Sequence, residues 1–223
     1  MSKKLTAEFL GSLLLAASVV GSGIMATTLT QDIAIQLFVN TITTVFMLFV
    51  IITLFSSISG AHFNPLVTII ELFYKRVTFQ EAALFVLSQI IGTSSGVVIA
   101  NLMFNKPAIE QSTFTRSGSY LFLAEVVATA GLILSILLLR HQNRGSMAAV
   151  IVPAWIGAAY IFTSSTSFAN PAITFARSLS ESFAGISIKS VPMFIFAQCI
   201  GALLGVLLAA ILTTEKRQDS VIA

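Results

Sequence analysis

The sequence carries little charge. Of its 223 residues, 12 are Lys or Arg and 9 are Asp or Glu, which together make 9% of the chain, whereas a soluble globular domain carries about 25%. Hydrophobic side chains make up 56%. This balance excludes a soluble globule and predicts a membrane protein of about six transmembrane helices, since each span needs ~20 apolar residues. No length remains for a separate soluble domain.

Other residue types and patterns that the sequence lacks exclude further classes of function. The single cysteine, Cys199, excludes a disulfide within the chain and argues against a thiolate metal cluster. We expect no metal site and no cofactor. The basic residues lie in short connecting segments, so the net charge of +3 does not indicate a nucleic-acid partner. The chain lacks a Ser/His or Asp/Asp constellation suited to an intramembrane enzyme, so we expect no enzyme.

The spacing of the charges predicts where the helices lie, because a central Asp, Lys or Arg costs ~2.5–3.5 kcal/mol on insertion. Three uncharged stretches of 23 to 25 residues each fit one span: 9–31, 82–105 and 190–214. A further span between Arg116 and Arg140 requires Glu125 inside it. Two uncharged stretches, 33–70 and 145–176, are 38 and 32 residues long, so each holds a span and a shorter piece.

An Asn-Pro pair marks the start of the shorter piece in both long stretches. The pairs are Asn64-Pro65 and Asn170-Pro171. Proline suits the first position of a helix and Asn is a good N-cap, so short helices are predicted to begin there. Each is about ten residues, or ~15 Å, and reaches only halfway through the membrane.

The chain contains an internal repeat. Residues 89–100 align with residues 198–209 at an offset of 109 and match at six of twelve positions, and the Asn-Pro pairs lie 106 apart. We therefore predict two halves of three spans each, approximately 1–104 and 117–214. Because three is an odd number, the second half is inverted in the membrane, as in transport proteins.

Basic residues predict the orientation of these halves. With both termini in the cytoplasm, the inside segments hold eight bases and the outside segments hold four, in agreement with the positive-inside rule. The inside bases are Lys3, Lys4, Lys75, Arg76, Arg140, Arg144, Lys216 and Arg217. The outside bases are Lys106, Arg116, Arg177 and Lys189.

Two inverted half-helices are expected to meet N-terminus to N-terminus near the membrane midplane, where irregular backbone lines a cavity. Both positive dipole ends, each about half an elementary charge, then repel cations, including hydronium, without obstructing neutral solutes. The amides of Asn64 and Asn170 are placed to donate hydrogen bonds to a passing oxygen and to interrupt a proton wire. The alternative is that each Asn only caps its helix.

The sequence resembles the aquaporin, or major intrinsic protein, family. The resemblance rests on Ser59-Gly-Ala-His62-Phe-Asn64-Pro65, on Phe168-Ala-Asn170-Pro171-Ala172, on Ala-Glu early in each half and on Gln-x-x-Gly-x-x-x-Gly in each third span. It implies an all-α membrane protein in which six transmembrane helices and two half-membrane helices form an inverted repeat, with one channel domain over 1–223. It also implies a homotetramer in the lipid bilayer of the cell inner (plasma) membrane. The expected pore constriction comprises Asn64, Pro65, Leu66, Asn170, Pro171 and Ala172.

Two departures from the family pattern bear on selectivity. Leu66 stands where the family's first motif usually has alanine, which adds bulk beside the junction of the half-helices. Ile173 stands where an arginine usually follows the second motif. Arg177 comes one helical turn later, which places it in the outer vestibule or among lipid headgroups. A small aliphatic residue at this place is typical of a bacterial aquaglyceroporin-like subgroup associated with arsenic resistance.

The family pattern also predicts a selectivity filter. Its expected members are Thr44, Ala158, Ser167 and Ile173, with Thr43 or Ala159 as alternatives if the alignment slips by one residue. Such a filter is wide, half apolar and without fixed charge, so it is expected to admit solutes larger than water. The expected permeants are water, glycerol-like polyols and neutral metalloids such as arsenous acid.

Two acids remain within the apolar halves. Glu8 and Glu125 are costly inside a membrane, and such residues often serve function. One hypothesis is a proton relay, which makes the protein a proton-coupled secondary transporter. The resemblance implies instead that both carboxylates brace the loops before the half-helices. His62, two residues before Asn64, is expected to be an oriented loop residue rather than a metal ligand.

Overall fold

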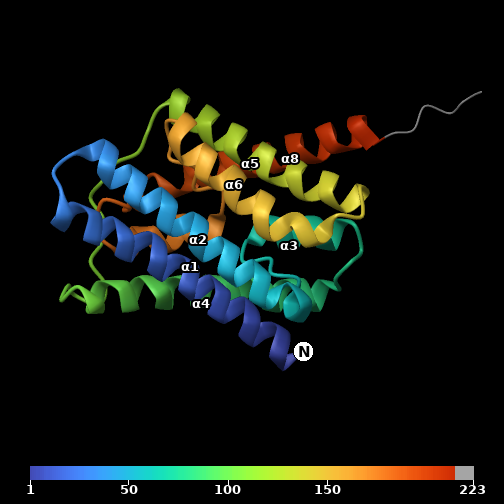
Figure 1. Cartoon of the computed structure of the whole chain (residues 1–223), viewed down its shortest axis with the longest axis horizontal. Helices are drawn as coiled ribbons and strands as arrows, with labels where there is room; N and C mark the ends of the chain where they lie inside the picture. The colour runs from blue at the N-terminus through green and yellow to red at the C-terminus, as the bar shows by residue number, and fades with distance from the viewer. Residues whose placement is uncertain (214–223) are drawn as a thin grey trace, which may run out of the picture.

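The structure is a computed structural model and describes residues 1–213. Six helices in this part of the chain are long and apolar enough to cross a membrane. They are α1 (Ser2–Leu29), α2 (Ile33–Ser59), α4 (Phe79–Met103), α5 (Ser119–His141), α6 (Ala148–Phe162), which follows the short 3-10 helix η1 (Gly145–Met147), and α8 (Val191–Thr213). They lie side by side as an elongated bundle (Figure 1). The predicted number of spans is confirmed.

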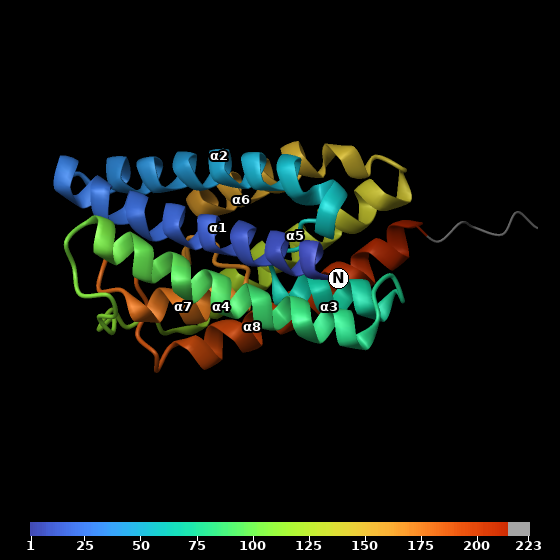
Figure 2. The ribbon, with the colours of Figure 1, turned by 90° about the horizontal axis from the view of Figure 1, so that it is seen from below.

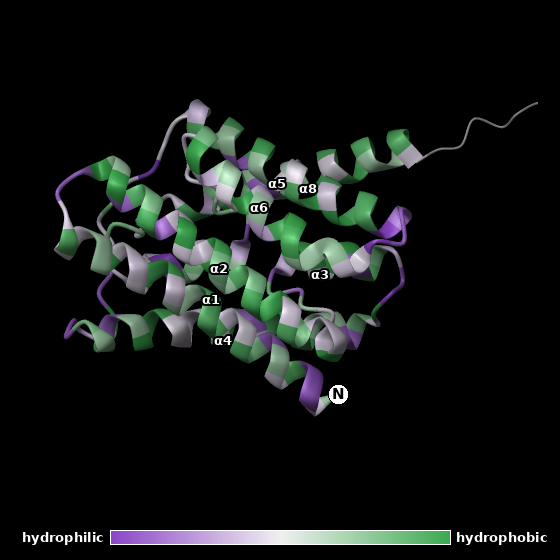
Figure 3. Ribbon diagram, viewed as in Figure 1, coloured by the Kyte–Doolittle hydropathy of each residue, from purple (hydrophilic) through white to green (hydrophobic). Residues whose placement is uncertain are grey.

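Polar residues concentrate at the ends of the bundle and in its connecting loops, whereas the helices are mostly apolar along their lengths (Figure 3). Many large apolar side chains face outward, including Phe38, Phe46 and Leu207, each about 60% exposed. In water such a surface would be unfavourable, but lipid tails are as apolar as these side chains. The protein is therefore a multi-pass membrane protein.

Two short helices begin inside the bundle. They are α3 (Pro65–Phe73) and α7 (Pro171–Ala176), and α7 continues as the 3-10 helix η2 (Arg177–Leu179). They follow one another along the bundle (Figure 2), and both pack against α4. The second is shorter as an α-helix than predicted, because its last turn tightens to 3-10 geometry. The predicted fold of six spans and two half-membrane helices is confirmed.

The order of crossings places the two halves in opposite orientations. α1 starts on the side of the N-terminus and crosses the bundle to the opposite side, and α2 crosses back. α3 then runs from the middle of the bundle to the side of the N-terminus. After α4 crosses, α5, α6 and α7 repeat this path from the opposite side. The residue range proposed for the second half ends at 214, and that residue lies outside the described part of the chain, as do Lys216 and Arg217.

Glycines allow the closest helix contacts. A Cβ atom at Gly92 of α4 would lie 2.5 Å from the Phe9 carbonyl oxygen of α1. A Cβ atom at Gly201 of α8 would lie 2.5 Å from the Val126 carbonyl oxygen of α5. Because Gly lacks this atom, the backbones of α1 and α4, and of α5 and α8, can approach closely. The repeated Gly-x-x-x-Gly pattern therefore joins the first and third long helices of each half.

The loop between α4 and α5 is anchored to the segment after α7. The Glu110 amide donates to the Leu179 carbonyl oxygen at 3.0 Å, and the Ser112 amide donates to that of Ser178 at 3.0 Å. The Ser187 amide donates to the Phe114 carbonyl oxygen at 2.8 Å. These bonds hold the loop against the segment that follows α7.

Candidate functional site

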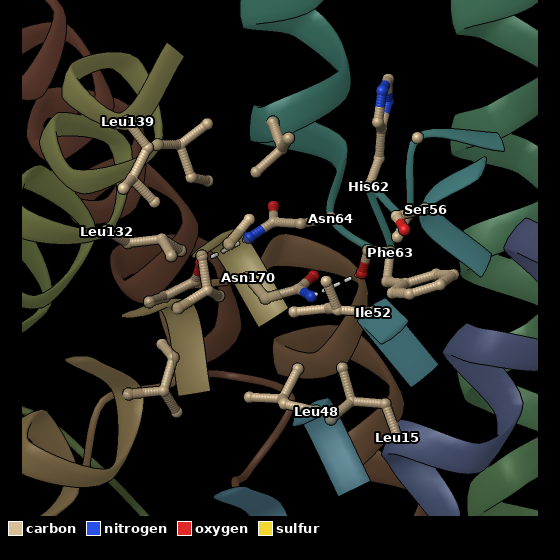
Figure 4. Close-up of a pocket in the computed structure, with 18 of the residues that line it drawn as sticks. Leu15, Leu48, Ile52, Ser56, His62, Phe63, Asn64, Leu132, Leu139 and Asn170 are labelled. Atoms are coloured by element: carbon tan, nitrogen blue, oxygen red, sulfur yellow. Dashed lines mark hydrogen bonds between the residues drawn. The ribbon is translucent and has the colours of Figure 1, made fainter. Parts of the chain in front are cut away.

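A cavity of about 730 Å³ follows the axis of the bundle. Apolar side chains of α1, α2, α5 and α6 line most of its wall, among them Leu15, Leu48 and Leu132 (Figure 4). Arg140 and Asn143 line it near the α5–α6 turn, on the side of the N-terminus. The wall is thus more apolar than polar, which is the usual composition of a site for small molecules.

The two motif asparagines face this cavity and hold the two loops together. Asn64 Nδ2 donates to the Ala169 carbonyl oxygen at 2.8 Å, and Asn170 Nδ2 donates to the Phe63 carbonyl oxygen at 2.8 Å. Figure 4 shows the two amides close together, with these bonds as dashed lines. An amide nitrogen carries two N–H donors, so each Asn keeps one for another acceptor.

The other amide atom of each Asn caps a half-helix. Asn64 Oδ1 accepts from the Leu66 amide at 2.9 Å, and Asn170 Oδ1 accepts from the Ala172 amide at 3.0 Å. Each Asn side chain can therefore cap its half-helix through Oδ1 and still offer one N–H of Nδ2 to a passing oxygen. The N-termini of α3 and α7 both point toward the cavity, and the macrodipoles of the two helices add there.

Leu66 does not narrow the cavity. Its side chain packs with Val67, Ile70, Ile133 and Leu137 in a buried apolar cluster between α3 and α5. The residues that line the cavity include neither Leu66 nor Pro65, Pro171 or Ala172. The bulk predicted beside the junction lies in the core instead.

Three of the four predicted filter residues meet at one end of the cavity. Thr44, Ser167 and Ile173 line it together and are all nearly fully buried. Ala158 differs from its predicted place, because its side chain is exposed on the outer face of α6 and does not line the cavity. The side chain of α6 that faces the cavity here lies ten residues before Asn170, whereas the prediction counted back twelve.

Tyr160 occupies the place predicted for Ala158. It lies two residues further along α6, which is about 200° around a helix, and its side chain is 3% exposed and lines the cavity. Its hydroxyl oxygen lies 3.5 Å from Thr44 Oγ1. The part of the cavity where the filter was predicted therefore contains an aromatic ring and three hydroxyl groups instead of a wide, half-apolar ring. The signal in the sequence is the four-residue spacing of Val152, Ile156 and Tyr160.

Glu8 is fully buried and accepts four hydrogen bonds. The Ser59 hydroxyl donates at 2.6 Å, the His62 and Phe63 amides at 3.0 and 2.8 Å, and Gln89 Nε2 at 2.8 Å. Phe63 has a φ of 48°, in the left-handed region that costs a side-chain-bearing residue energy. The carboxylate stabilises this strained turn, as the bracing hypothesis expects.

Glu125 makes the equivalent contacts in the second half. It is fully buried and accepts from the Phe168 and Ala169 amides at 2.9 and 3.0 Å and from Gln198 Nε2 at 2.7 Å. Ala169 has a φ of 47°, close to that of Phe63. Neither carboxylate lines the cavity.

His62 lies on the cavity wall beside its loop. Its Nδ1 is 3.1 Å from Thr68 Oγ1, and its ring packs edge-on against Phe85. Residues 1–213 contain no group of three or more His, Cys, Asp or Glu side chains that could hold a metal ion.

Arg177 lies neither in the vestibule nor among headgroups. Its side chain is 2% exposed, it does not line the cavity, and its Cζ lies 3.4 Å from the centre of the Phe168 ring. The segment after η2 covers the side chain, because Arg177 Nε donates to the Ala184 carbonyl oxygen.

A buried ion cluster on the side of the N-terminus was not expected from the sequence. Glu71 of α3 contacts Arg140 at 2.6 Å and Arg76 at 3.2 Å, and Glu71 is 2% exposed. Both arginines line the cavity. The only signal is that Glu71 stands within an apolar half-helix, where an unpaired acid would be costly.

The profile of the Major intrinsic protein family matches residues 1–167 and 163–223, which together cover the whole chain. The chain belongs to the major intrinsic protein family. The cavity described above is accordingly the pore of a membrane channel of this family rather than the active site of an enzyme.

Relatives and a solved structure agree with this assignment. Aquaglyceroporin AqpS from Rhizobium meliloti (strain 1021) is 42% identical over 202 residues, 91% of this chain and 86% of that protein. The aquaglyceroporin of Toxoplasma gondii (strain ATCC 50611 / Me49) is 31% identical over 164 residues, 70% of this chain and 61% of that protein. The predicted resemblance to the aquaglyceroporin-like branch of the major intrinsic protein family is confirmed.

The fold matches that of an aquaglyceroporin from Plasmodium falciparum determined by X-ray crystallography. The TM-score is 0.69 at 18% sequence identity, and the match covers 96% of each chain. At this identity the similarity concerns the fold, which is that of the major intrinsic proteins.

Proposed function

We propose that the protein is a passive channel for water, for glycerol-like polyols and for neutral trihydroxylated metalloids such as arsenous acid. The observation that carries this proposal is a cavity whose filter residues, Thr44, Tyr160, Ser167 and Ile173, include no charged side chain. Hydroxyl groups and one apolar side chain suit a solute that carries several OH groups on a small carbon or metalloid centre. The 42% identity to an aquaglyceroporin supports the same class.

We propose that the centre of the pore excludes protons and ions. The Asn64 and Asn170 side chains each keep one N–H donor for a passing oxygen, and two half-helix N-termini add positive potential there. A water molecule that accepts from both amides cannot accept a proton from its neighbour in the chain of waters. Neutral solutes pay no comparable electrostatic cost.

We also propose the location and assembly. Both termini lie in the cytoplasm, the bilayer is the plasma membrane, and four copies form a homotetramer. Within residues 1–213, six bases lie in segments on the side of the N-terminus and four on the other, which supports the orientation. The two sequence halves act as one channel domain, since the cavity is lined from both.

The contacts of the buried acids do not favour a proton-coupled transporter. Glu8 and Glu125 are fully buried, accept three or four hydrogen bonds each and do not line the cavity. A proton relay needs a carboxyl group that exchanges protons with the permeation path. Their geometry supports the loop-bracing role that we propose for both.

A permeability panel tests this proposal. The protein is reconstituted in liposomes, and light scattering follows shrinkage in hyperosmotic sucrose and reswelling in glycerol and in arsenous acid, each against protein-free vesicles. We expect faster equilibration of all three permeants. Acceleration for water alone would contradict the proposal that the filter admits hydroxylated solutes.

A further inference from the structure

The outer filter lacks a charged side chain, but two arginines lie directly behind it. Arg177 is in η2, and Arg116 is in the loop before α5. Their guanidinium carbons lie 3.4 and 5.2 Å from the centre of the same ring, that of Phe168. Phe168 is one of the residues that line the cavity, and its ring packs against Phe194 in a buried apolar cluster. Two positive charges are therefore stacked on a residue of the cavity wall.

Arg177 is held in this place by the segment after η2. Its Nε donates to the Ala184 carbonyl oxygen, while Nη1 has no hydrogen-bond partner. Within residues 1–213 no salt bridge reaches the Arg177 side chain. A buried guanidinium without a carboxylate is costly, and proteins retain such groups chiefly where the charge serves a purpose.

Arg116 lies against the same ring without an ion pair in the described chain. Its Nε donates to the Gly185 carbonyl oxygen at 3.0 Å and its Nη2 to that of Phe183 at 3.4 Å. Burial lowers the pKa of Arg116 to about 10, while Glu125 and Tyr160 are close enough to favour its charged form. The guanidinium therefore remains protonated at neutral pH.

The inverted repeat shows that this arrangement is specific to the outer half. Arg177 is the seventh residue after Asn170, and the seventh residue after Asn64 is Glu71. Both are 2% exposed. The first makes no salt bridge in the described residues, whereas the second is an acid held between two bases. Two arginines share one nearby buried carboxylate, that of Glu125, so this end of the pore carries an excess of positive charge.

We propose that Arg177 and Arg116, packed on Phe168, form a cation barrier that replaces the charge missing from Ile173 in the filter. Both charges act on the pore through a medium of low dielectric, where repulsion of a cation is weakly screened. Neutral solutes are unaffected, and no guanidinium occupies the filter. The pore can thus exclude cations without a charged group touching the solute. This inference rests on the proposed function, because it assigns the charge selectivity of that same pore.

The test compares proton leak with glycerol flux in the same liposomes. Entrapped pyranine reports the leak under a potential clamped by valinomycin, and light scattering reports glycerol. We expect Arg177→Gln to raise proton leak about tenfold without changing glycerol flux. Adding Arg116→Gln is expected to raise the leak further. Arg177→Lys is expected to keep the leak low, because the positive charge remains. Adding Ile173→Arg to Arg177→Gln is expected to restore the exclusion of protons. Arg144→Gln removes a positive charge elsewhere in the protein and is the control, in which proton leak is expected to stay low.

Several outcomes would overturn this inference. If Arg177→Gln lowers glycerol flux and leaves proton leak unchanged, the side chain only supports the loop, and the channel proposal still stands. If Arg177→Lys leaks as much as Arg177→Gln, the charge is not the cause. If the unsubstituted protein passes no glycerol, the proposed function fails, and this barrier fails with it.

Discussion

Tyr160 is the largest side chain of the proposed filter, and we propose that it limits the size of the solutes that pass. The Tyr160→Ala substitution removes the ring and the hydroxyl group next to Thr44, so solutes longer than glycerol gain room. We expect the flux of a five-carbon polyol, relative to water, to rise about tenfold, which corresponds to about 1.4 kcal/mol of barrier. Light scattering of proteoliposomes in xylitol and in sucrose gives this ratio.

Ala158 offers the matched control. Its side chain is exposed on the outer face of α6, so Ala158→Leu adds bulk outside the cavity and is expected to leave the ratio of polyol to water flux unchanged. A change in this ratio for Ala158→Leu but not for Tyr160→Ala would contradict the observed orientation of α6.

The sequence predicted the positions of some side chains at the pore and not those of others. Asn64 and Asn170 were predictable because proline and the N-cap act within two residues. Tyr160 was not, because its orientation depends on the length of the following loop, and an error of two residues turns a helical side chain to the opposite face. The burial of Arg177 was not predictable either, because it depends on the Ala184 carbonyl group across a loop.

Close helix packing depends on glycines at a few positions. A Cβ atom at Gly96 of α4 would overlap the Leu13 carbonyl oxygen of α1, and backbone cannot move aside as a flexible side chain can. We expect Gly96→Ala to destabilise the protein by about 1–3 kcal/mol, the usual cost of overpacking. Resistance to unfolding in detergent, followed by helical circular dichroism against SDS concentration, measures this change.

Gly21 of α1 controls for helix propensity. A Cβ atom there would lie 3.5 Å from the Phe104 ring, which is an ordinary contact. Gly21→Ala is therefore expected to keep or raise stability, since Ala is favoured over Gly inside a helix by about 0.5–1 kcal/mol. Equal losses for Gly21→Ala and Gly96→Ala would mean that close approach is not what Gly96 provides.

Local signals in the sequence predicted where the helices lie better than they predicted which residues of different helices contact one another. Each half-helix was predictable from its Asn-Pro pair and from uncharged stretches too long for one span. The cluster of Glu71, Arg76 and Arg140 was not, because its members come from two elements 69 positions apart in the chain. Pairing across such a separation leaves no local pattern in the sequence.

In the molecule as a whole, two inverted halves surround one cavity but differ in charge. Each half supplies one Asn, one buried Glu and one short helix to the centre. The first half adds Glu71 between two arginines on the side of the N-terminus, whereas the second adds Arg177 without a carboxylate on the other side. The central structure is therefore symmetric, and the charge selectivity that we propose is not.

Above all, we propose that neutral solutes cross this pore passively. The most direct measurement follows radiolabelled glycerol entering proteoliposomes with the outside acid by about two pH units, and without a pH gradient. A passive pore predicts equal glycerol concentrations inside and outside in both cases, at the same rate. Accumulation above the external concentration when the gradient is present, and its loss when the gradient collapses, would show a coupled transporter and contradict the account.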